Sequence, residues 1–316
     1  MPSSYDAPEE EIITPAQFKE SMKLVRLQIA VPISVLISMG ANLVCALAIK
    51  PGLGGISALY PTLLTPNTLM VGLYWACLYS VQVGFCLTLL LVRKEETKET
   101  LVNGVGLRFA IANWLMAGWA VAWTLQLFVV AEIIILLNVI NVLSIHLTLL
   151  PYPPTFHRPM DAIFIHAPMT MLLAILFELD WMHNGFIALG WVIRDESKWS
   201  TWTWPAVAAV AGTNVITALW AGFRRQYILT VASVYLLFAL LLSSPRTTPT
   251  LPTTALPKPT ALLVTLVICL VLHPATLLAG VAWQRTRERE GRIRLEDEVR
   301  EAEENERLAE VEAARA

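Results

Sequence analysis

Long apolar runs separated by short polar loops are the feature that most limits what this chain can fold into. The sequence holds 23 basic and 25 acidic residues, and 22 of these charges fall in the long stretch between residues 25 and 283. A helix needs roughly 20 apolar residues to cross a bilayer core. This distribution excludes a soluble enzyme, a disordered scaffold and a nucleic-acid-binding protein, because each would carry more charge. We predict an all-α, polytopic transmembrane helical bundle in a lipid bilayer.

Eight runs are long and apolar enough to be predicted as spans. They are 25–49, 67–92, 107–124, 127–150, 163–193, 202–222, 226–244 and 261–283. The fifth run would be about 45 Å long as a straight helix, so it must tilt, break or protrude. The predicted organisation is an acidic cytosolic segment (1–24), the transmembrane bundle (25–283) and a charged, helical cytosolic tail (284–316).

Basic residues are unevenly distributed over the loops that these spans define. The side that holds both termini has fifteen Lys and Arg residues close to the spans, and the opposite side has five. Because cytosolic loops are enriched in Lys and Arg, we expect both termini in the cytosol. The short run 226–244 suits the thinner endoplasmic reticulum bilayer. The endoplasmic reticulum or another endomembrane is therefore favoured, with the plasma membrane and the mitochondrion as alternatives.

The C-terminal tail, residues 284–316, is rich in Glu and Arg at spacings of three and four, which supports a solvated helix. Its apolar residues Ile293, Val299, Leu308 and Val311 keep no heptad, as a coiled coil would require. A solvent-exposed helix is the simpler interpretation. A protein contact through the tail, or a homo-oligomer, stays open.

Three stretches with aromatic or proline signals carry a family resemblance. Residues 60–88, YPTLLTPNTLMVGLYWACLYSVQVGFCLT, place Trp75 and Tyr79 four apart on one helical face. The stretch ANWLMAGWAVAW holds Trp114 and Trp119, and HAPMTM opens the fifth span. In this order they resemble the longer branch of the tryptophan-rich sensory protein family, also known as the translocator or peripheral benzodiazepine receptor family.

The resemblance covers roughly residues 25–245 and implies a membrane protein without enzymatic activity. It also implies an intramembrane pocket for a flat hydrophobic ligand, a tetrapyrrole or a sterol, because indoles offer large apolar contact and one N–H each. Two family features are missing, a Trp-x-Phe entry to the second span and a Gly-Trp after Pro168. The His-Ala-Pro entry and the charged tail look closer to a fungal family of multi-spanning membrane proteins.

Polar side chains at membrane depth are further candidates, because each is costly there unless paired or hydrated. Glu132 lies about one turn inside the fourth run, and Asn214 lies within the sixth. Glu178, Asp180 and His183 cluster in the fifth run, where acids two residues apart point to different faces of a regular helix. Either Glu178 faces a polar cavity, or the span ends before Asp180 and the next residues lie at the membrane surface.

The predicted ligand-binding residues share an aromatic or hydrogen-bonding side chain within a span: Trp75, Tyr79, Trp114, Trp119, Glu132, Glu178 and Asn214. We expect no catalytic residue, no metal and no cofactor. The buried Glu and Asn residues make a small-solute or proton-coupled transporter the main alternative, although the two halves show no internal repeat.

An intramembrane metal-dependent hydrolase is a third hypothesis. His157, Asp161, His166 and His183 are the residues that could supply ligands. Pro159 interrupts the helical spacing of the first pair, and a straight fifth span would separate the first His from the last by a membrane thickness. The sequence therefore disfavours a metal site.

Overall fold

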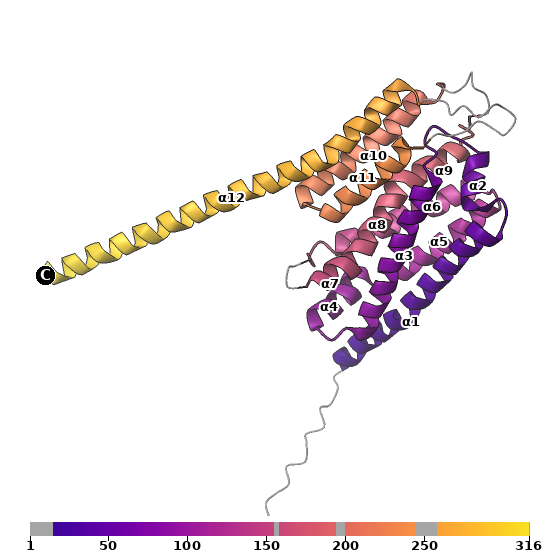
Figure 1. Ribbon diagram of the computed structural model, residues 1–316. Helices are drawn as coiled ribbons and strands as arrows, with labels where there is room; N and C mark the ends of the chain where they lie inside the picture. Colours follow the sequence, from indigo (N-terminus) through magenta and orange to yellow (C-terminus); the bar gives the residue numbers. More distant parts are fainter. Residues whose placement is uncertain (1–14, 155–157, 194–199, 244–257, 316) are drawn as a thin grey trace, which may run out of the picture.

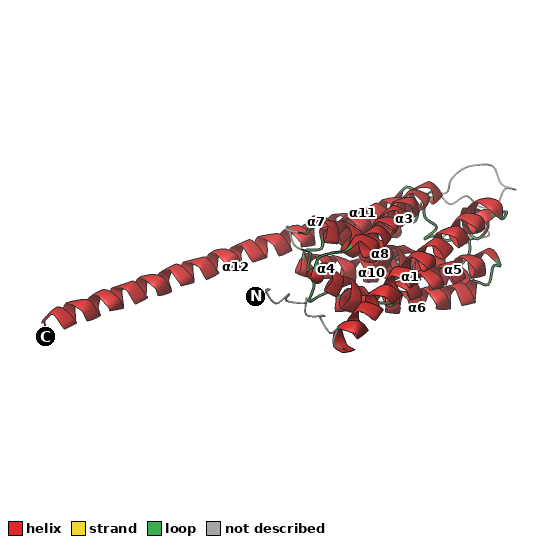
Figure 2. Ribbon diagram, turned by 90° about the horizontal axis from the view of Figure 1, so that it is seen from below, coloured by secondary structure: helices red, strands yellow, loops and turns green. Residues whose placement is uncertain are grey.

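The structure is a computed structural model that describes residues 15–154, 158–193, 200–243 and 258–315, all of them in helices, turns or loops. Figure 2 shows helices and no strand in these ranges. Six helical units are long and apolar enough to cross a membrane, and two shorter apolar helices accompany them. The predicted fold class, an all-α multi-pass bundle of about eight spans, is confirmed.

The helical units have the following bounds. The long ones are α1 (Pro15–Leu43), extended by a π-helical turn η1 (Val44–Ala48), α3 (Thr68–Leu91), α6 (Phe128–Thr148), α10 (Thr203–Arg224) and α12 (Thr260–Arg315). The sixth unit is a composite of α7 (Pro159–Asp161), η3 (Ala162–His166), α8 (Ala167–Ile175), η4 (Leu176–Asp180) and α9 (Trp181–Ala188). The shorter helices are α2 (Gly52–Leu59), α4 (Glu95–Glu99) with its π-helical turn η2 (Thr100–Val105), α5 (Arg108–Thr124) and α11 (Tyr227–Leu241).

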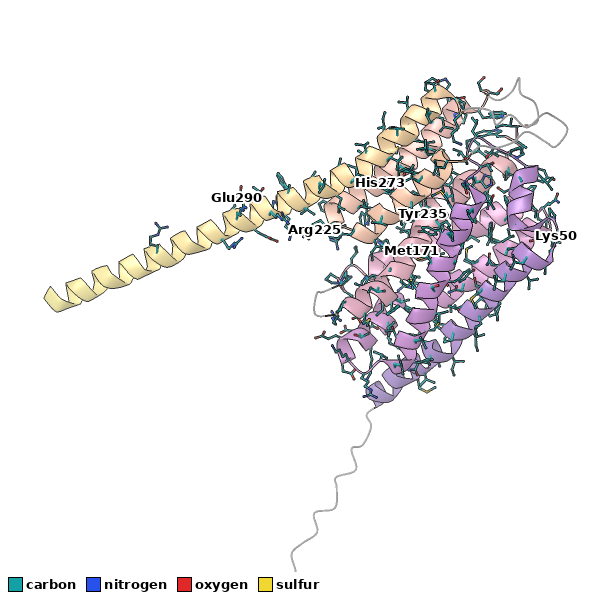
Figure 3. All side chains as sticks on the ribbon, viewed as in Figure 1. Lys50, Met171, Arg225, Tyr235, His273 and Glu290 are labelled. Atoms are coloured by element: carbon teal, nitrogen blue, oxygen red, sulfur yellow. The ribbon has the colours of Figure 1, made fainter. Side chains whose placement is uncertain are left out.

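The composite helix α7–α9 is the most buried of the six long units. Its apolar side chains fill the interior on several faces, and α3, α6 and α11 pack against α8. Two tyrosines link α3 to its neighbours. Tyr74 Oη on α3 donates to the carbonyl of Met171 on α8 (2.7 Å), and Tyr235 Oη on α11 donates to the carbonyl of Met70 on α3 (2.9 Å). Figure 3 labels Met171 and Tyr235 within the bundle. The composite helix therefore lies in contact with several neighbouring helices.

The two ends of the bundle differ. At one end, α2 and the end of α9 lie together, and at the other α4 and α7 lie together (Figure 1). The 56-residue helix α12 packs on α10 and α11 with its apolar part, and its charged part projects away from the bundle. Trp204 lies at the start of α10, and Trp283 lies on α12 three residues after Gly280, which packs on Gly222 near the end of α10. They expose 72% and 65% of their surface, as tryptophans at the two interfaces of a membrane do.

Candidate functional site

A cap formed by α2 and the loop that follows it closes one end of the bundle. Trp123, at the end of α5, donates its indole N–H to the carbonyl of Leu53 in α2 (3.2 Å). Tyr60 donates to the side-chain oxygen of Gln126 in the α5–α6 turn (2.7 Å). The loop is a proline-bounded turn, and the Asn67 side chain accepts the first free N–H groups of α3. The cap is thus attached by side chains to the helices beneath it.

His183 on α9 lies directly under the cap. Its Nε2 is 2.7 Å from the hydroxyl of Ser57, and its Nδ1 is 3.3 Å from the hydroxyl of Thr62. The ring centroid is 5.9 Å from that of Trp123. Because both ring nitrogens have partners, the imidazole is held in one orientation and links the cap to the central helix.

Two acids two residues apart are both buried in the turn η4, because other helices cover the composite helix on several faces. Glu178 and Asp180 expose 2% and 9% of their surface. Glu178 Oε1 accepts a hydrogen bond from the hydroxyl of Ser233 on α11 (2.6 Å). Glu132 on α6 faces the next part of the composite helix, where a Cβ atom at Gly185 would lie 3.4 Å from its Oε1. Because residues two apart lie on nearly opposite sides of a helix, the two acids face different neighbouring helices.

Trp119 and Glu132 come together because α5 and α6 form an antiparallel hairpin. The side-chain amide of Asn138 donates to the carbonyl of Ala112 (3.2 Å), which fixes the register of the pair. Trp119 is seven residues after Ala112, and Glu132 is six residues before Asn138. Both therefore lie at a similar height, on the side of that contact nearer the α5–α6 turn. The Trp119 ring stacks on Trp123 with centroids 6.0 Å apart. The two stacked indoles of α5 therefore lie at about the same height in the bundle as the Glu132 carboxyl group, which faces Gly185 on α9.

Several polar atoms in this region are buried without a hydrogen-bond partner among the described residues. Two are donors, Trp119 Nε1 and Asn184 Nδ2, and two are acceptors, Glu132 Oε2 and Asp180 Oδ2. Most buried polar atoms in proteins are hydrogen-bonded, so four unsatisfied atoms on neighbouring helices are notable. We use the name capped cluster for the residues that share this location: Trp119, Trp123, Glu132, Asp180, His183 and Asn184.

The sequence predicted an aromatic pair at Trp75 and Tyr79, and the structure places it on another face of the bundle. The two rings lie 5.6 Å apart on α3, both partly buried, and the Tyr79 hydroxyl is 3.3 Å from that of Ser38 on α1. This pair lies at the contact between α1 and α3. The polar contact of this pair is therefore with α1, and the pair is not part of the capped cluster.

The other predicted residues also occupy separate places. Trp114 is 50% exposed on the outer surface of α5. Asn214 is fully buried between α10 and α12, with its side-chain oxygen 3.1 Å from Nε2 of His273. Glu178 faces α11, as described above. Of the seven predicted residues, Trp119 and Glu132 therefore belong to the capped cluster.

The residues considered for a metal site are also dispersed. Asp161 is bound by the Thr97 hydroxyl and the Arg158 guanidinium at the end opposite the cap, whereas His183 contacts the cap. His157 lies outside the described residues. Within the described ranges, no three His, Cys, Asp or Glu side chains form a group that could hold a metal ion.

Asp180 and His183 were noted from sequence as a cluster at the membrane surface or in a cavity. The structure continues the helix through them to Ala188 and buries both side chains. Sequence reasoning missed Trp123 and Asn184 as site residues. The spacing of four between Trp119 and Trp123 was a usable signal, since it matches that of Trp75 and Tyr79.

Comparison with known proteins places the chain in a family. The model of the family described as TSPO-like protein matches residues 28–272, more than three quarters of the chain. No curated protein and no solved structure matches. The predicted resemblance to the tryptophan-rich sensory group is confirmed, and the likeness to a fungal branch stays a prediction. The chain is a multi-pass integral membrane protein that belongs to the TSPO-like protein family.

Proposed function

We propose that this protein binds a flat hydrophobic molecule in the capped cluster and carries out no catalysis. The observations that support this most are the four unpartnered polar atoms on the adjacent helices α5, α6 and α9 and the two stacked indoles of α5, under the cap at one end of the bundle. A ligand with an apolar plane and a few hydrogen-bonding groups complements such a site. Membership in the TSPO-like family agrees with this role.

The polar atoms favour one of the two predicted ligand classes. Glu132 and Asp180 offer acceptor oxygens, and an unpartnered carboxyl oxygen in a low-dielectric interior is costly. A tetrapyrrole supplies several N–H donors within one plane, whereas a sterol supplies one hydroxyl group. The indole and amide donors of Trp119 and Asn184 would suit the acidic side chains of a tetrapyrrole. We therefore favour a tetrapyrrole over a sterol.

A small-solute or proton-coupled transporter is the second candidate. Glu178 is buried with one oxygen on Ser233, and its other oxygen has no partner within the described part of the chain. Asp180 on the same turn and Glu132 on the adjacent α6 are two further carboxyl groups in this part of the bundle. Ionisable groups inside a membrane commonly mark ion pathways. Uptake of a labelled solute that depends on Glu178 would favour this function.

We also propose that both termini face the cytosol and that the protein resides in the endoplasmic reticulum or another endomembrane. The basis is the excess of Lys and Arg at the end that includes α4, α7 and the α10–α11 turn. An Asn-x-Ser/Thr sequon inserted into the 243–259 linker should be glycosylated, and one appended after the tail should not. The reverse pattern would reject this orientation.

Titration of the purified protein with a porphyrin tests the proposed function. Its tryptophan fluorescence should fall saturably, and an excess of unlabelled porphyrin should displace a radiolabelled porphyrin from the protein. A sterol should compete at least tenfold less well. The variant Trp119→Phe, which keeps an aromatic ring but removes the N–H, should bind about tenfold more weakly. Quenching that neither saturates nor is competed would reject ligand binding and shift support to transport.

A further inference from the structure

A groove lies at the end of the bundle opposite the cap, where α3, α4 and the start of the composite helix meet (Figure 1). Its volume is about 390 Å³. The apolar part of its lining comes mainly from α3 and from Met160 and Phe164, and its polar part comes from the segment between α3 and α4. The groove is thus amphipathic, with an apolar wall that leads to a basic rim.

The basic rim consists of Arg93 and Lys94, which stand beside the acidic and basic residues of α4. Glu95 pairs with Lys98, and Glu96 lies 3.5 Å from the Arg158 guanidinium. The rim residues Arg93 and Lys94 are exposed and have no ion pair within the described part of the chain. Asp161 shares Arg158 with Glu96, and Glu99 accepts the Tyr152 hydroxyl, so among the described residues the side chains of Arg93 and Lys94 are the ones left open to a bound anion.

The groove floor is fixed by buried polar contacts. Asp161 is 7% exposed, and it accepts the Thr97 hydroxyl (3.0 Å) and pairs with Arg158 (3.2 Å). One turn further, the ring of Phe164 packs directly on Gly84, where a Cβ atom would collide with it. These contacts join α4, α7 and α3. The groove is therefore a built feature of this end rather than a gap between mobile loops.

The position of the groove matches the boundary between lipid chains and headgroups. The span α3 ends at Leu91, and the next two side chains after Val92 are the basic ones. Leu87, Leu91 and Met160 are 54%, 74% and 61% exposed, as side chains in contact with lipid chains would be. An amphiphile could place its chain along these residues and its headgroup at the rim.

We propose that this groove binds an anionic glycerophospholipid, with its phosphate-bearing headgroup on Arg93 and Lys94 and an acyl chain along α3 and Met160. The charge of the rim selects an anionic headgroup over a zwitterionic one, because basic residues near a membrane surface attract anionic lipids. The apolar wall selects a lipid over a soluble phosphate. This site is independent of the capped cluster, which lies at the other end.

Native mass spectrometry of the full chain in mild detergent tests the site. Dioleoyl phosphatidylglycerol should bind at least tenfold more tightly than dioleoyl phosphatidylcholine in its first adduct. The double variant Arg93→Gln/Lys94→Gln should lose that preference. The matched control Arg224→Gln/Arg225→Gln removes two exposed arginines at the same end and should keep the preference within twofold. Melting temperatures of all forms report whether each variant is folded.

Two further measurements distinguish a lipid site from a site for a soluble anion. Glycerol phosphate at millimolar concentration should fail to displace the lipid, and Met160→Glu should weaken binding of phosphatidylglycerol by disturbing the apolar wall. Equal binding of the two lipids by the native chain would overturn the proposal. So would an equal effect of the two double variants, which would indicate nonspecific charge attraction. Full displacement by glycerol phosphate would also overturn it, because the site would then be an anion site without a lipid-chain component.

Discussion

Two aromatic pairs with the same spacing occupy different environments in this protein. Trp75 and Tyr79 lie on α3, partly buried, with rings 5.6 Å apart and inclined by 34°. Trp119 and Trp123 lie on α5, almost fully buried, with rings 6.0 Å apart and inclined by 26°. The first pair has a hydroxyl of α1 as its polar neighbour, and the second has the imidazole of His183 and the Leu53 carbonyl of the cap.

The difference shows that spacing alone does not define a ligand site. A spacing of four places two rings on one face of any helix, whether that face contacts a helix or a ligand. What separates the two pairs is the balance of polar atoms around them. The Tyr79 hydroxyl has a partner, whereas the Trp119 N–H has none among the described residues. The four predictions that follow test this contrast.

Replacing Trp123 by Ala should have the largest effect. The indole contacts Phe128 with centroids 5.3 Å apart, stacks on Trp119 and holds the cap through Leu53. Its loss should lower the free energy of unfolding by about 3–5 kcal/mol. The partly buried Trp75→Ala should lower it by about 1 kcal/mol, since less apolar area is involved. Melting in a single detergent measures both. A larger loss of unfolding free energy for Trp75→Ala than for Trp123→Ala would contradict the proposed difference between the two aromatic pairs.

The next prediction concerns the carboxyl groups. Asp180→Asn and Glu132→Gln should weaken porphyrin binding about tenfold, or about 1.4 kcal/mol, because each changes an acceptor that the ligand needs. Without ligand, the same variants should be as stable as the native chain or more so, since they remove an unsatisfied acidic group. Glu178→Gln, which keeps the oxygen that faces Ser233, serves as the control and should bind within twofold of native. If this control also binds porphyrin weakly, Glu178 belongs to the same ligand site as the capped cluster.

Ser57→Ala should loosen the cap. The lost hydrogen bond to His183 contributes about 1 kcal/mol, and hydrogen exchange in residues 52–59 should become faster. Ser80→Ala is the matched control, because the Ser80 hydroxyl bonds to the Ala76 carbonyl within its own helix. Unchanged exchange in the Ser57 variant would show that the cap is held without the imidazole.

Gly185→Ala should give the smallest effect. A Cβ atom at this position would lie 3.4 Å from Oε1 of Glu132, so the carboxyl group must shift slightly. Porphyrin affinity should fall about threefold, or about 0.6 kcal/mol, with little change in melting temperature. Gly118→Ala, whose Cβ would meet a neighbour at 3.8 Å, should leave the affinity unchanged. Equal affinities of both variants would indicate that the ligand does not require this side of Glu132.

Much of the fold could be predicted from the sequence because membrane crossing imposes a simple rule on it. Twenty apolar residues without charge must be helical in a bilayer, so hydropathy alone indicates most of the helices. The composite helix could not be predicted in detail. Its π-helical turns leave no strong mark in the sequence, and the helix that each acid of FELD faces depends on how the bundle packs around the composite helix.

The candidate site was predictable in part. Trp119 and Glu132 were identified from residue type and depth, but their proximity depends on the register of α5 and α6, which an asparagine-to-carbonyl bond fixes. Trp114 and Trp119 occur in one stretch, five residues apart, yet one is 50% exposed and the other 8%. A rotation of 140° around a helix separates them. Which of the two faces inward depends on packing with neighbouring helices.

Photocrosslinking locates the ligand most directly. A diazirine-bearing tetrapyrrole should label peptides of α5 and α9 that include Trp119, Trp123 and Asn184, and an excess of unmodified tetrapyrrole should prevent the labelling. Trp119→Phe should reduce the labelling, and Trp75→Phe should not. Competable labelling of the α3 peptide around Trp75, with none on α5 and α9, would contradict a ligand site at the capped cluster.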